Sequence, residues 1–216
     1  MDFKPYIIIQ IIFLAFVLAF IIHEIRITGA SSSKERKLAV YTLLILFIGI
    51  LLRSINLSYP HGVFVDEAMG AYDSWSLANY GVDSNLASYP VYLKSWGTGQ
   101  SALYAYLALP FIKLFGLNVE AYRLPMSLIS CLALIVLYKT LKKSQQSGSL
   151  VFCITAFLAI NPWHIIKSRF AVDCNICPDL VLIGICLIIL SIYTHRRKTG
   201  LTVAGFSLLA LSAYGY

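Results

Sequence analysis

The sequence predicts an all-α fold, a polytopic transmembrane helical bundle. Of its 216 residues, 59% are hydrophobic and 12% are charged, which is about half the charged fraction of an ordinary soluble domain. The apolar residues come in long runs, and about 20 apolar residues in a helix cross about 30 Å of hydrocarbon. Short alternating segments between tight turns, which are typical of membrane barrels, do not occur. We therefore expect a single transmembrane domain over residues 1–216.

Seven apolar runs are the candidate helices, at 6–22, 38–57, 101–117, 124–141, 150–166, 180–193 and 201–216. The first run follows an early lysine, as an export signal does. However, it is long for the apolar part of a signal, and it ends in His23-Glu24-Ile25-Arg26 rather than at a small-residue cleavage site. It is therefore expected to be a membrane anchor.

Basic residues between the runs indicate the topology. Ten of the 17 Lys and Arg residues form three clusters, namely Arg26, Lys34, Arg36 and Lys37; Lys139, Lys142 and Lys143; and Arg196, Arg197 and Lys198. Such clusters are typical of cytoplasmic loops, because their translocation is unfavourable and the anionic inner leaflet attracts them. Topology thus accounts for the net charge of +7, and no nucleic-acid partner is expected.

One run is expected not to cross, because three runs separate the first basic cluster from the second and the two clusters should share a side. The run 101–117 is the shortest of the three, and Pro110 and Lys113 interrupt it. We expect it to lie along the outer face, with Tyr104 and Tyr106 at the interface. The predicted crossings are then 6–25, 38–57, 124–141, 150–166 and 180–193, with a last run from 201.

This topology places two loops, 58–123 and 167–179, on the extracytoplasmic side of a multi-pass plasma-membrane protein. Seven of the ten acidic residues lie in or beside these loops: Asp66, Glu67, Asp73, Asp83, Glu120, Asp173 and Asp179. The acidic side chains are therefore expected to gather at one face of the membrane.

The long loop 58–123 is expected to contain two interfacial helices, of which the second is the run 101–117. The first helix begins at Asp66 and is ended by Gly81. Its residues at helical spacing are Ala68, Tyr72, Trp75 and Ala78. This spacing places one apolar face against the membrane or against the bundle.

Asp66 and Glu67 are the first candidates for chemistry, because two carboxylates emerge from an apolar segment at the membrane surface. One interpretation is helix capping, in which an N-cap aspartate and first-turn acids stabilise the helix by about 1 kcal/mol. The other is catalysis or ligand binding. A carboxylate can serve both purposes, so both interpretations stay open.

The second outer loop contributes His164, Arg169 and Asp173 to the same face. They form either part of a site or an interfacial anchor. In the anchor interpretation Lys167 and Arg169 snorkel toward the headgroups and Asp173 pairs with Arg169. Arg53, ahead of the long loop, is likewise expected to snorkel.

Cys174 and Cys177 form a lone C-x-x-C. There is no second pair and no suitably spaced histidine, so a metal site is weakly supported. Two unpaired thiols are the simpler expectation, and no metal ligand is assigned.

An ordered series of short motifs carries a family resemblance. The motifs are Val65-Asp66-Glu67-Ala68, Tyr80-Gly81, Tyr89-Pro90, Gly99-Gln100, Leu103-Tyr104, Leu114-Phe115-Gly116 and Tyr122-Arg123-Leu124-Pro125. Together with the stretch 161–173, this series resembles the membrane-embedded GT-C glycosyltransferases. It is most similar to the branch of protein O-mannosyltransferases and bacterial aminoarabinose transferases. The resemblance covers roughly residues 53–178.

The resemblance implies an inverting transfer of a sugar from a polyprenyl-phosphate donor to a hydroxyl acceptor on the outer face. Asp66 would be the general base, while Glu67 and Asp173 would shape the catalytic pocket. The candidates for binding the donor's phosphate and sugar are Lys94, Gln100, Arg123, His164 and Arg169. The lipid-linked sugar and membrane lipids are the expected partners. No cofactor is assigned, and a divalent metal requirement and the acceptor stay open.

Such glycosyltransferases usually have eleven or more transmembrane helices, so this chain is expected to be an amino-terminal portion of one. The helix at 6–25, ahead of the one that leads into the acidic loop, departs from the family pattern. The alternative function is a non-catalytic membrane subunit or a transporter component. Few charges lie within the predicted crossings, which disfavours an ion pathway.

Overall fold

The structure, a computed structural model, describes residues 5–28, 32–95, 97–194 and 197–215. Within these ranges the protein is an all-α helical bundle, as the sequence predicts. The helices are α1 (Tyr6–Ile27), α2 (Ser33–Ser54), α3 (Val65–Tyr80), α4 (Ala102–Phe115), α5 (Val119–Lys143), α6 (Gly148–Ala159), α7 (Pro162–Lys167), the 3-10 helix η2 (Asp173–Ile176), α8 (Cys177–Ile192) and α9 (Lys198–Tyr214). Strands β1 (Tyr92–Ser95) and β2 (Thr98–Ser101) add a small antiparallel hairpin that the sequence did not predict.

Four helical segments are long and apolar enough to cross a membrane. They are α1, α2, α5 and the continuous segment Asp173–Ile192 formed by η2 and α8. The crossings predicted at 6–25 and 124–141 fall within two of these segments, and those predicted at 38–57 and 180–193 overlap the other two but end slightly later. The prediction of a transmembrane protein is therefore confirmed at the level of its helices.

The predicted crossing at 150–166 differs, because the run forms two helices, α6 and α7, instead of one. The Asn161 side chain accepts a hydrogen bond from the backbone N–H of His164, and Pro162 occupies the first turn of α7. Asparagine as N-cap followed by proline is a helix-start signal. The 12 residues of α6 rise only about 18 Å, which is short of the hydrocarbon thickness.

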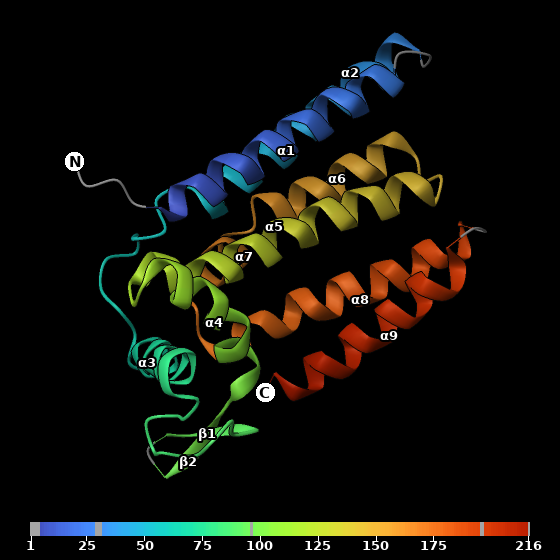
Figure 1. Cartoon of the computed structure of the whole chain (residues 1–216). Coiled ribbons are helices and arrows are strands. Elements are labelled where there is room, and N and C mark those ends of the chain that lie inside the picture. Colours follow the sequence, from blue (N-terminus) through green and yellow to red (C-terminus); the bar gives the residue numbers. More distant parts are fainter. Residues whose placement is uncertain (1–4, 29–31, 96, 195–196, 216) are drawn as a thin grey trace.

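The bundle has two chemically distinct ends (Figure 1). The carboxyl ends of α1, α5 and α8 and the amino ends of α2, α6 and α9 lie at one end, which we call the basic end. Its described basic residues are Arg26, Lys34, Arg36, Lys37, Lys139, Lys142, Lys143, Arg197 and Lys198. Arg196 lies outside the described residues. The opposite end, which we call the α3 end, holds α3, α4, α7 and the hairpin. The described members of all three basic clusters thus share one end, as the predicted topology requires.

Helix α3 runs from Val65 to Tyr80, and Gly81 ends it with a left-handed φ of 71°, as expected. Small residues face the bundle: a Cβ on Gly70 would lie 2.3 Å from the Tyr122 hydroxyl, and the Ser74 hydroxyl donates to the Ala105 carbonyl oxygen at 3.1 Å. The predicted apolar face is divided: Tyr72 is 48% exposed, whereas Trp75 packs against the buried cluster that includes Ala71 and Tyr104.

Helix α4 packs between α3 and the first turns of α5 at the α3 end (Figure 1). Its 14 residues rise about 21 Å, so it is shorter than a crossing needs. The expected interfacial position of Tyr104 is wrong. Tyr104 is fully buried, and its hydroxyl donates to the Tyr122 carbonyl oxygen, because the bundle supplies a partner that water would otherwise supply.

Helices α8 and α9 approach each other closely at two glycines. A Cβ on Gly205 would lie 2.8 Å from the Gly184 carbonyl oxygen, and a Cβ on Gly184 would lie 2.9 Å from that of Gly205. Small residues at such a crossing let two membrane helices pack backbone to backbone. The contact therefore holds α9 against the bundle.

Replacing Gly205 with alanine is expected to destabilise this contact, although alanine favours a helix by about 1 kcal/mol over glycine. The matched control is Gly200→Ala in the same helix, where a Cβ would meet nothing within 4 Å. Thermal unfolding in detergent should show a lower midpoint for Gly205→Ala and an unchanged or higher one for Gly200→Ala. Equal midpoints would contradict the close approach.

Candidate functional site

A buried ion pair joins α3 to α5 at the α3 end. The Nε and Nη2 groups of Arg123 donate to the two carboxylate oxygens of Glu67 at 2.6 and 2.7 Å. Glu67 also accepts the backbone N–H of Ala171 at 3.0 Å. The remaining N–H groups of Arg123 donate, each at 3.0 Å, to the carbonyl oxygens of Leu57, Pro60 and Gly62.

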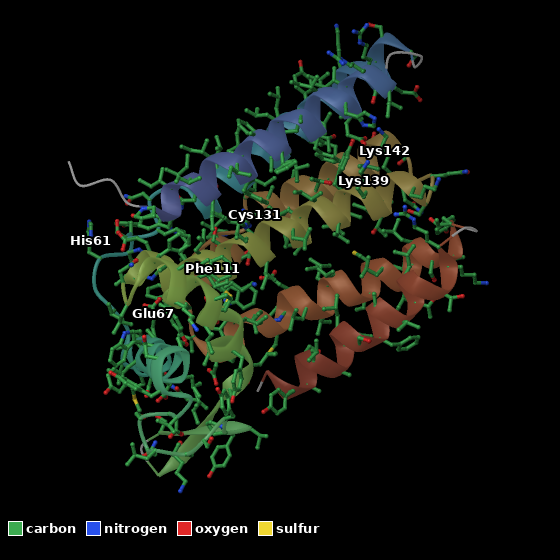
Figure 2. The ribbon with its side chains drawn as sticks, viewed as in Figure 1. His61, Glu67, Phe111, Cys131, Lys139 and Lys142 are labelled. Carbon is green, nitrogen blue, oxygen red and sulfur yellow. The ribbon has the colours of Figure 1, made fainter. Side chains whose placement is uncertain are left out.

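All five N–H groups of Arg123 are therefore engaged, and its side chain is 0% exposed. Arg123 therefore has no N–H left with which to bind the donor's phosphate, the role that the family resemblance implies for it. Glu67, seen at this end in Figure 2, is 1% exposed and equally engaged. The pair instead fixes the segment that leads into α3, and with it the start of the helix that carries Asp66.

A second buried network links α2, α7, α8 and α5. The Nε and Nη2 groups of Arg53 lie 3.0 and 2.9 Å from Nδ1 of His164. Nε2 of His164 lies 2.9 Å from a carboxylate oxygen of Asp179. Lys167 and Ser130 donate to the other oxygen of Asp179. Since an arginine can only donate, Nδ1 of His164 accepts and Nε2 carries the proton, so the ring is neutral.

The network overturns the expectation that Arg53 and Lys167 snorkel toward the headgroups. Arg53 is 0% exposed and Lys167 is 3% exposed, and each is hydrogen-bonded within the bundle. The sequence predicts a substrate-binding role for His164 and none for Asp179. Asp179 could have been found by its position beside an apolar run, because an ionisable residue there requires a partner.

His164 makes the network sensitive to acid. It lies in α7, outside the four spanning segments. Burial is the largest cause that lowers its pKa below the ordinary value of 6.5. The charges of Lys167 and Arg53 lower the pKa further, and Asp179 opposes the shift. The unfolded chain therefore binds a proton at a higher pH than the folded chain. By linkage, the stability that the neutral ring supports is complete above pH 6.5 and is lost as the pH falls below it.

We expect the free energy of unfolding in detergent to fall as the pH drops below about 6.5, and His164→Gln to remove most of this slope. The matched control is His61→Gln, because His61 is exposed and makes only a ring contact with Tyr59. A slope that persists in His164→Gln would assign the acid sensitivity to another group.

Asp66 differs from every other described carboxylate at the α3 end, because it has no hydrogen bond or ion pair. Its neighbours are all engaged: Asp73, Asp83 and Asp173 accept backbone N–H groups, Glu120 accepts a tyrosine hydroxyl, and Glu67 and Asp179 are ion-paired. Asp66 is half-buried in the first turn of α3. The N-cap position belongs to Phe64, without a side-chain cap, so Asp66 does not cap the helix.

Asp173 and Arg169 do not pair, which corrects the anchor interpretation. The Asp173 carboxylate accepts the backbone N–H of Ser101 at 2.7 Å and that of Cys174 at 2.8 Å. It thereby ties η2 to the start of α4 and lies at the same end as Asp66.

Arg169 donates three hydrogen bonds, to the carbonyl oxygens of Leu52, Tyr59 and Asn56. It is 8% exposed and forms no ion pair with any described residue. Two of its five N–H groups, one on each terminal nitrogen, remain without a partner in the described chain. Burial, and then the charge of Arg123, lower the pKa of Arg169 below its usual value, as expected for a cation without a counter-ion.

Two grooves lie beside α7. The apolar groove, of about 520 Å³, is lined by Ile48, Leu51, Leu52, Ile55, Asn56, Tyr59, Pro60, Ile165, Ile166 and Arg169. The aromatic groove, of about 270 Å³, is lined by Phe64, Trp163, Ile166, Lys167, Phe170, Val172 and Asn175. Ile166 lines both grooves, so they are adjacent. The first has a guanidinium and the second an ammonium among otherwise mostly apolar walls.

Lys94 and Gln100 lie on the hairpin, away from these grooves in sequence and in fold. Lys94 is exposed on β1, where it pairs with Gly99, and Gln100 on β2 lies opposite Leu93. Their expected contacts with a phosphate stay predictions.

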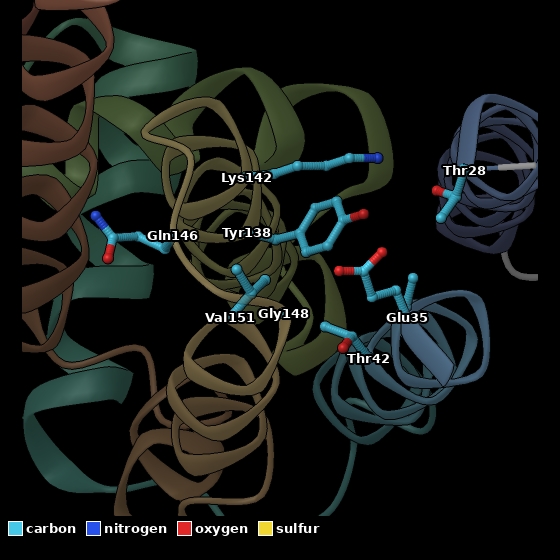
Figure 3. A pocket seen from close by; sticks show the side chains of 9 residues that line it. Thr28, Glu35, Thr42, Tyr138, Lys142, Gln146, Gly148 and Val151 are labelled. Atoms are coloured by element: carbon cyan, nitrogen blue, oxygen red, sulfur yellow. The ribbon is translucent and has the colours of Figure 1, made fainter. Parts of the chain in front are cut away.

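A further pocket of about 260 Å³ lies at the basic end, where its lining includes Thr28, Glu35, Thr42, Tyr138 and Lys142 (Figure 3). It is therefore remote from Asp66. The nearby lysines 139 and 142 are already neutralised in part by Glu24, which is 2% exposed and pairs with both. We assign no function to this pocket.

Within the described ranges, no group of three or more His, Cys, Asp or Glu side chains could hold a metal ion. The arrangement at the α3 end instead offers one free carboxylate, one under-used guanidinium and two grooves. Comparison of the chain with protein-family models, with curated proteins and with solved structures finds no match.

Proposed function

We propose that this chain is the amino-terminal part of a membrane glycosyltransferase of the GT-C type. It would transfer a sugar from a polyprenyl-phosphate donor to a hydroxyl acceptor at the α3 end, on the extracytoplasmic face of the plasma membrane. The observation that carries the proposal is the unpartnered carboxylate of Asp66, because a general base must have a free lone pair for the proton it takes.

The apolar groove suits the donor's lipid and phosphate. Its wall of isoleucine and leucine side chains from α2 and α7 matches a polyprenyl chain. Arg169 at this groove has one free N–H on each terminal nitrogen, and guanidinium groups bind phosphate oxygens through two such donors. A phosphate there would also supply the counter-charge that the described chain does not give to Arg169.

The aromatic groove suits the sugar. The C–H groups on one face of a sugar ring pack on the electron-rich face of an aromatic ring, and Phe64, Trp163 and Phe170 line this groove. Phe64 lies two residues before Asp66 in the chain. A donor that crosses Ile166 would therefore carry its phosphate at Arg169 and its sugar toward the start of α3.

In the reaction, the acceptor hydroxyl oxygen attacks the anomeric carbon while Asp66 takes its proton. The bond from that carbon to the phosphate oxygen breaks, and the lipid phosphate leaves as an anion. This leaving group needs cations rather than a general acid. Arg169, the guanidinium that lines the apolar groove, has free N–H groups for that purpose. Asp173 and the Glu67–Arg123 pair hold the surrounding backbone.

The test is donor binding and consumption by the full-length gene product in detergent, with a panel of polyprenyl-phosphate sugars and with polyprenyl phosphate alone. Arg169→Gln should weaken binding of polyprenyl phosphate roughly 10- to 100-fold, as the loss of a charged hydrogen bond predicts. The matched control is Arg36→Gln, at the basic end. Unchanged binding in Arg169→Gln would remove the phosphate from this groove, and failure to consume any donor would contradict sugar transfer.

A further inference from the structure

Cys174 and Cys177 meet at the junction between η2 and α8. Cys174 lies in η2, and Cys177 is the first residue of α8. The backbone N–H of Cys177 donates to the carbonyl oxygen of Cys174. This three-residue turn is that of a 3-10 helix, in which the side chains of residues i and i+3 lie on the same side.

The turn also sets the distance between the two residues. A 3-10 helix rises about 2 Å per residue, so two residues separated by one full turn are about 6 Å apart between their Cα atoms. Disulfides join Cα atoms that are about 4.4–6.8 Å apart. The turn therefore already holds the two residues at a separation that a disulfide spans, without a change in the backbone.

Accessibility separates this pair from the other cysteines. Cys174 and Cys177 are partly exposed, whereas Cys131 and Cys186 are 0% and 3% exposed. Cys153 is exposed on α6 but has no cysteine three residues away. All five are free thiols in this structure.

We propose that Cys174 and Cys177 form a reversible disulfide, which makes the η2–α8 junction a redox-sensitive site. A small disulfide is the oxidant. The thiolate of one cysteine attacks a sulfur of the oxidant, which releases one small thiolate and leaves a mixed disulfide. The thiolate of the other cysteine then attacks the protein sulfur and releases the second small thiolate. Two electrons pass to the oxidant, and the two protons of the cysteines end on the released thiols.

The Cys174–Cys177 disulfide would lie where several helices contact one another. The Cys174 N–H is held by Asp173, whose other carboxylate oxygen holds the start of α4. Cys177 packs against the end of α9, where a Cβ on Gly215 would lie 2.6 Å from the Cys177 sulfur. The disulfide therefore stiffens the point at which η2, α4, α8 and α9 meet. This inference is independent of the proposed sugar transfer.

The test equilibrates the purified full-length protein in detergent with reduced and oxidised glutathione, then alkylates the remaining thiols and analyses the peptides by mass spectrometry. The tryptic peptide that follows Arg169 and ends at Arg196 carries Cys186 as well as Cys174 and Cys177. The experiment therefore uses a Cys186→Ser background, in which this peptide contains only the pair. We expect Cys174 and Cys177 to lose both alkylation sites together, by loss of two hydrogens, and to regain them on reduction. Cys153→Ser, the matched control, should behave identically.

The single variant Cys177→Ser should instead leave Cys174 alkylated or bound to one glutathione, because no internal partner remains. Two outcomes would overturn the proposal. One is that both thiols stay alkylatable under conditions in which exposed Cys153 takes up glutathione. The other is that they yield only mixed disulfides or cross-linked chains.

Discussion

Replacing Asp66 with asparagine is expected to abolish sugar transfer by the full-length gene product, by a factor of about 10²–10⁴, the usual contribution of a general base. Asparagine has nearly the same shape but cannot take the proton of the acceptor hydroxyl. The measurement is the rate of donor consumption at saturating donor. Since Asp66 makes no hydrogen bond in the described chain, the fold should not change.

Glu35→Gln is the matched control for Asp66→Asn. Glu35 lies at the basic end, and its carboxylate is likewise without a hydrogen bond or ion pair in the described chain. This variant should retain full activity. Both variants should insert into membranes and bind polyprenyl phosphate like the natural chain. Full activity in Asp66→Asn would exclude Asp66 from the reaction.

Replacing Glu67 with glutamine is expected to lower the free energy of unfolding more than any other single substitution proposed above. The change leaves the guanidinium of Arg123, 0% exposed, without its counter-charge. Breaking a buried pair by removing one partner typically costs about 3–5 kcal/mol. Chemical unfolding in detergent should show this loss, and Asp66→Asn, one residue earlier in the same turn, should not.

The double variant Glu67→Leu with Arg123→Met separates the charge effect from the packing effect. It removes both charges, so it should recover part of the lost stability. Recovery should be incomplete, because the carbonyl oxygens of Leu57, Pro60 and Gly62 lose the Arg123 N–H groups. A Glu67→Gln protein as stable as the natural chain would show that the buried cation is compensated by other groups.

Several features of the fold followed from local chemistry alone. Four of the five crossings predicted from the apolar runs correspond to helical segments long and apolar enough to span, because crossing hydrocarbon demands length and hydrophobicity and little else. Gly81 predicted the end of α3, because it can adopt a positive φ. The run 101–117 was expected not to cross, and it forms a helix of only 14 residues.

Two features of the fold do not follow from hydrophobicity and charge alone. Asn161-Pro162 is a helix-start pair inside an apolar run, and hydrophobicity alone made that run look continuous. Arg53 was interpreted as a snorkelling side chain because its partner, His164, lies 111 residues away in the sequence.

By itself, the sequence determined the membrane class, most of the helices and the gathering of acids near one end, since composition and spacing are properties of the chain. Only the tertiary structure decided which of those acids is free. Asp66 and Glu67 are neighbours, yet consecutive residues of an α-helix point about 100° apart. Helix packing therefore turned Glu67 toward Arg123, 56 residues away, and left Asp66 without a partner.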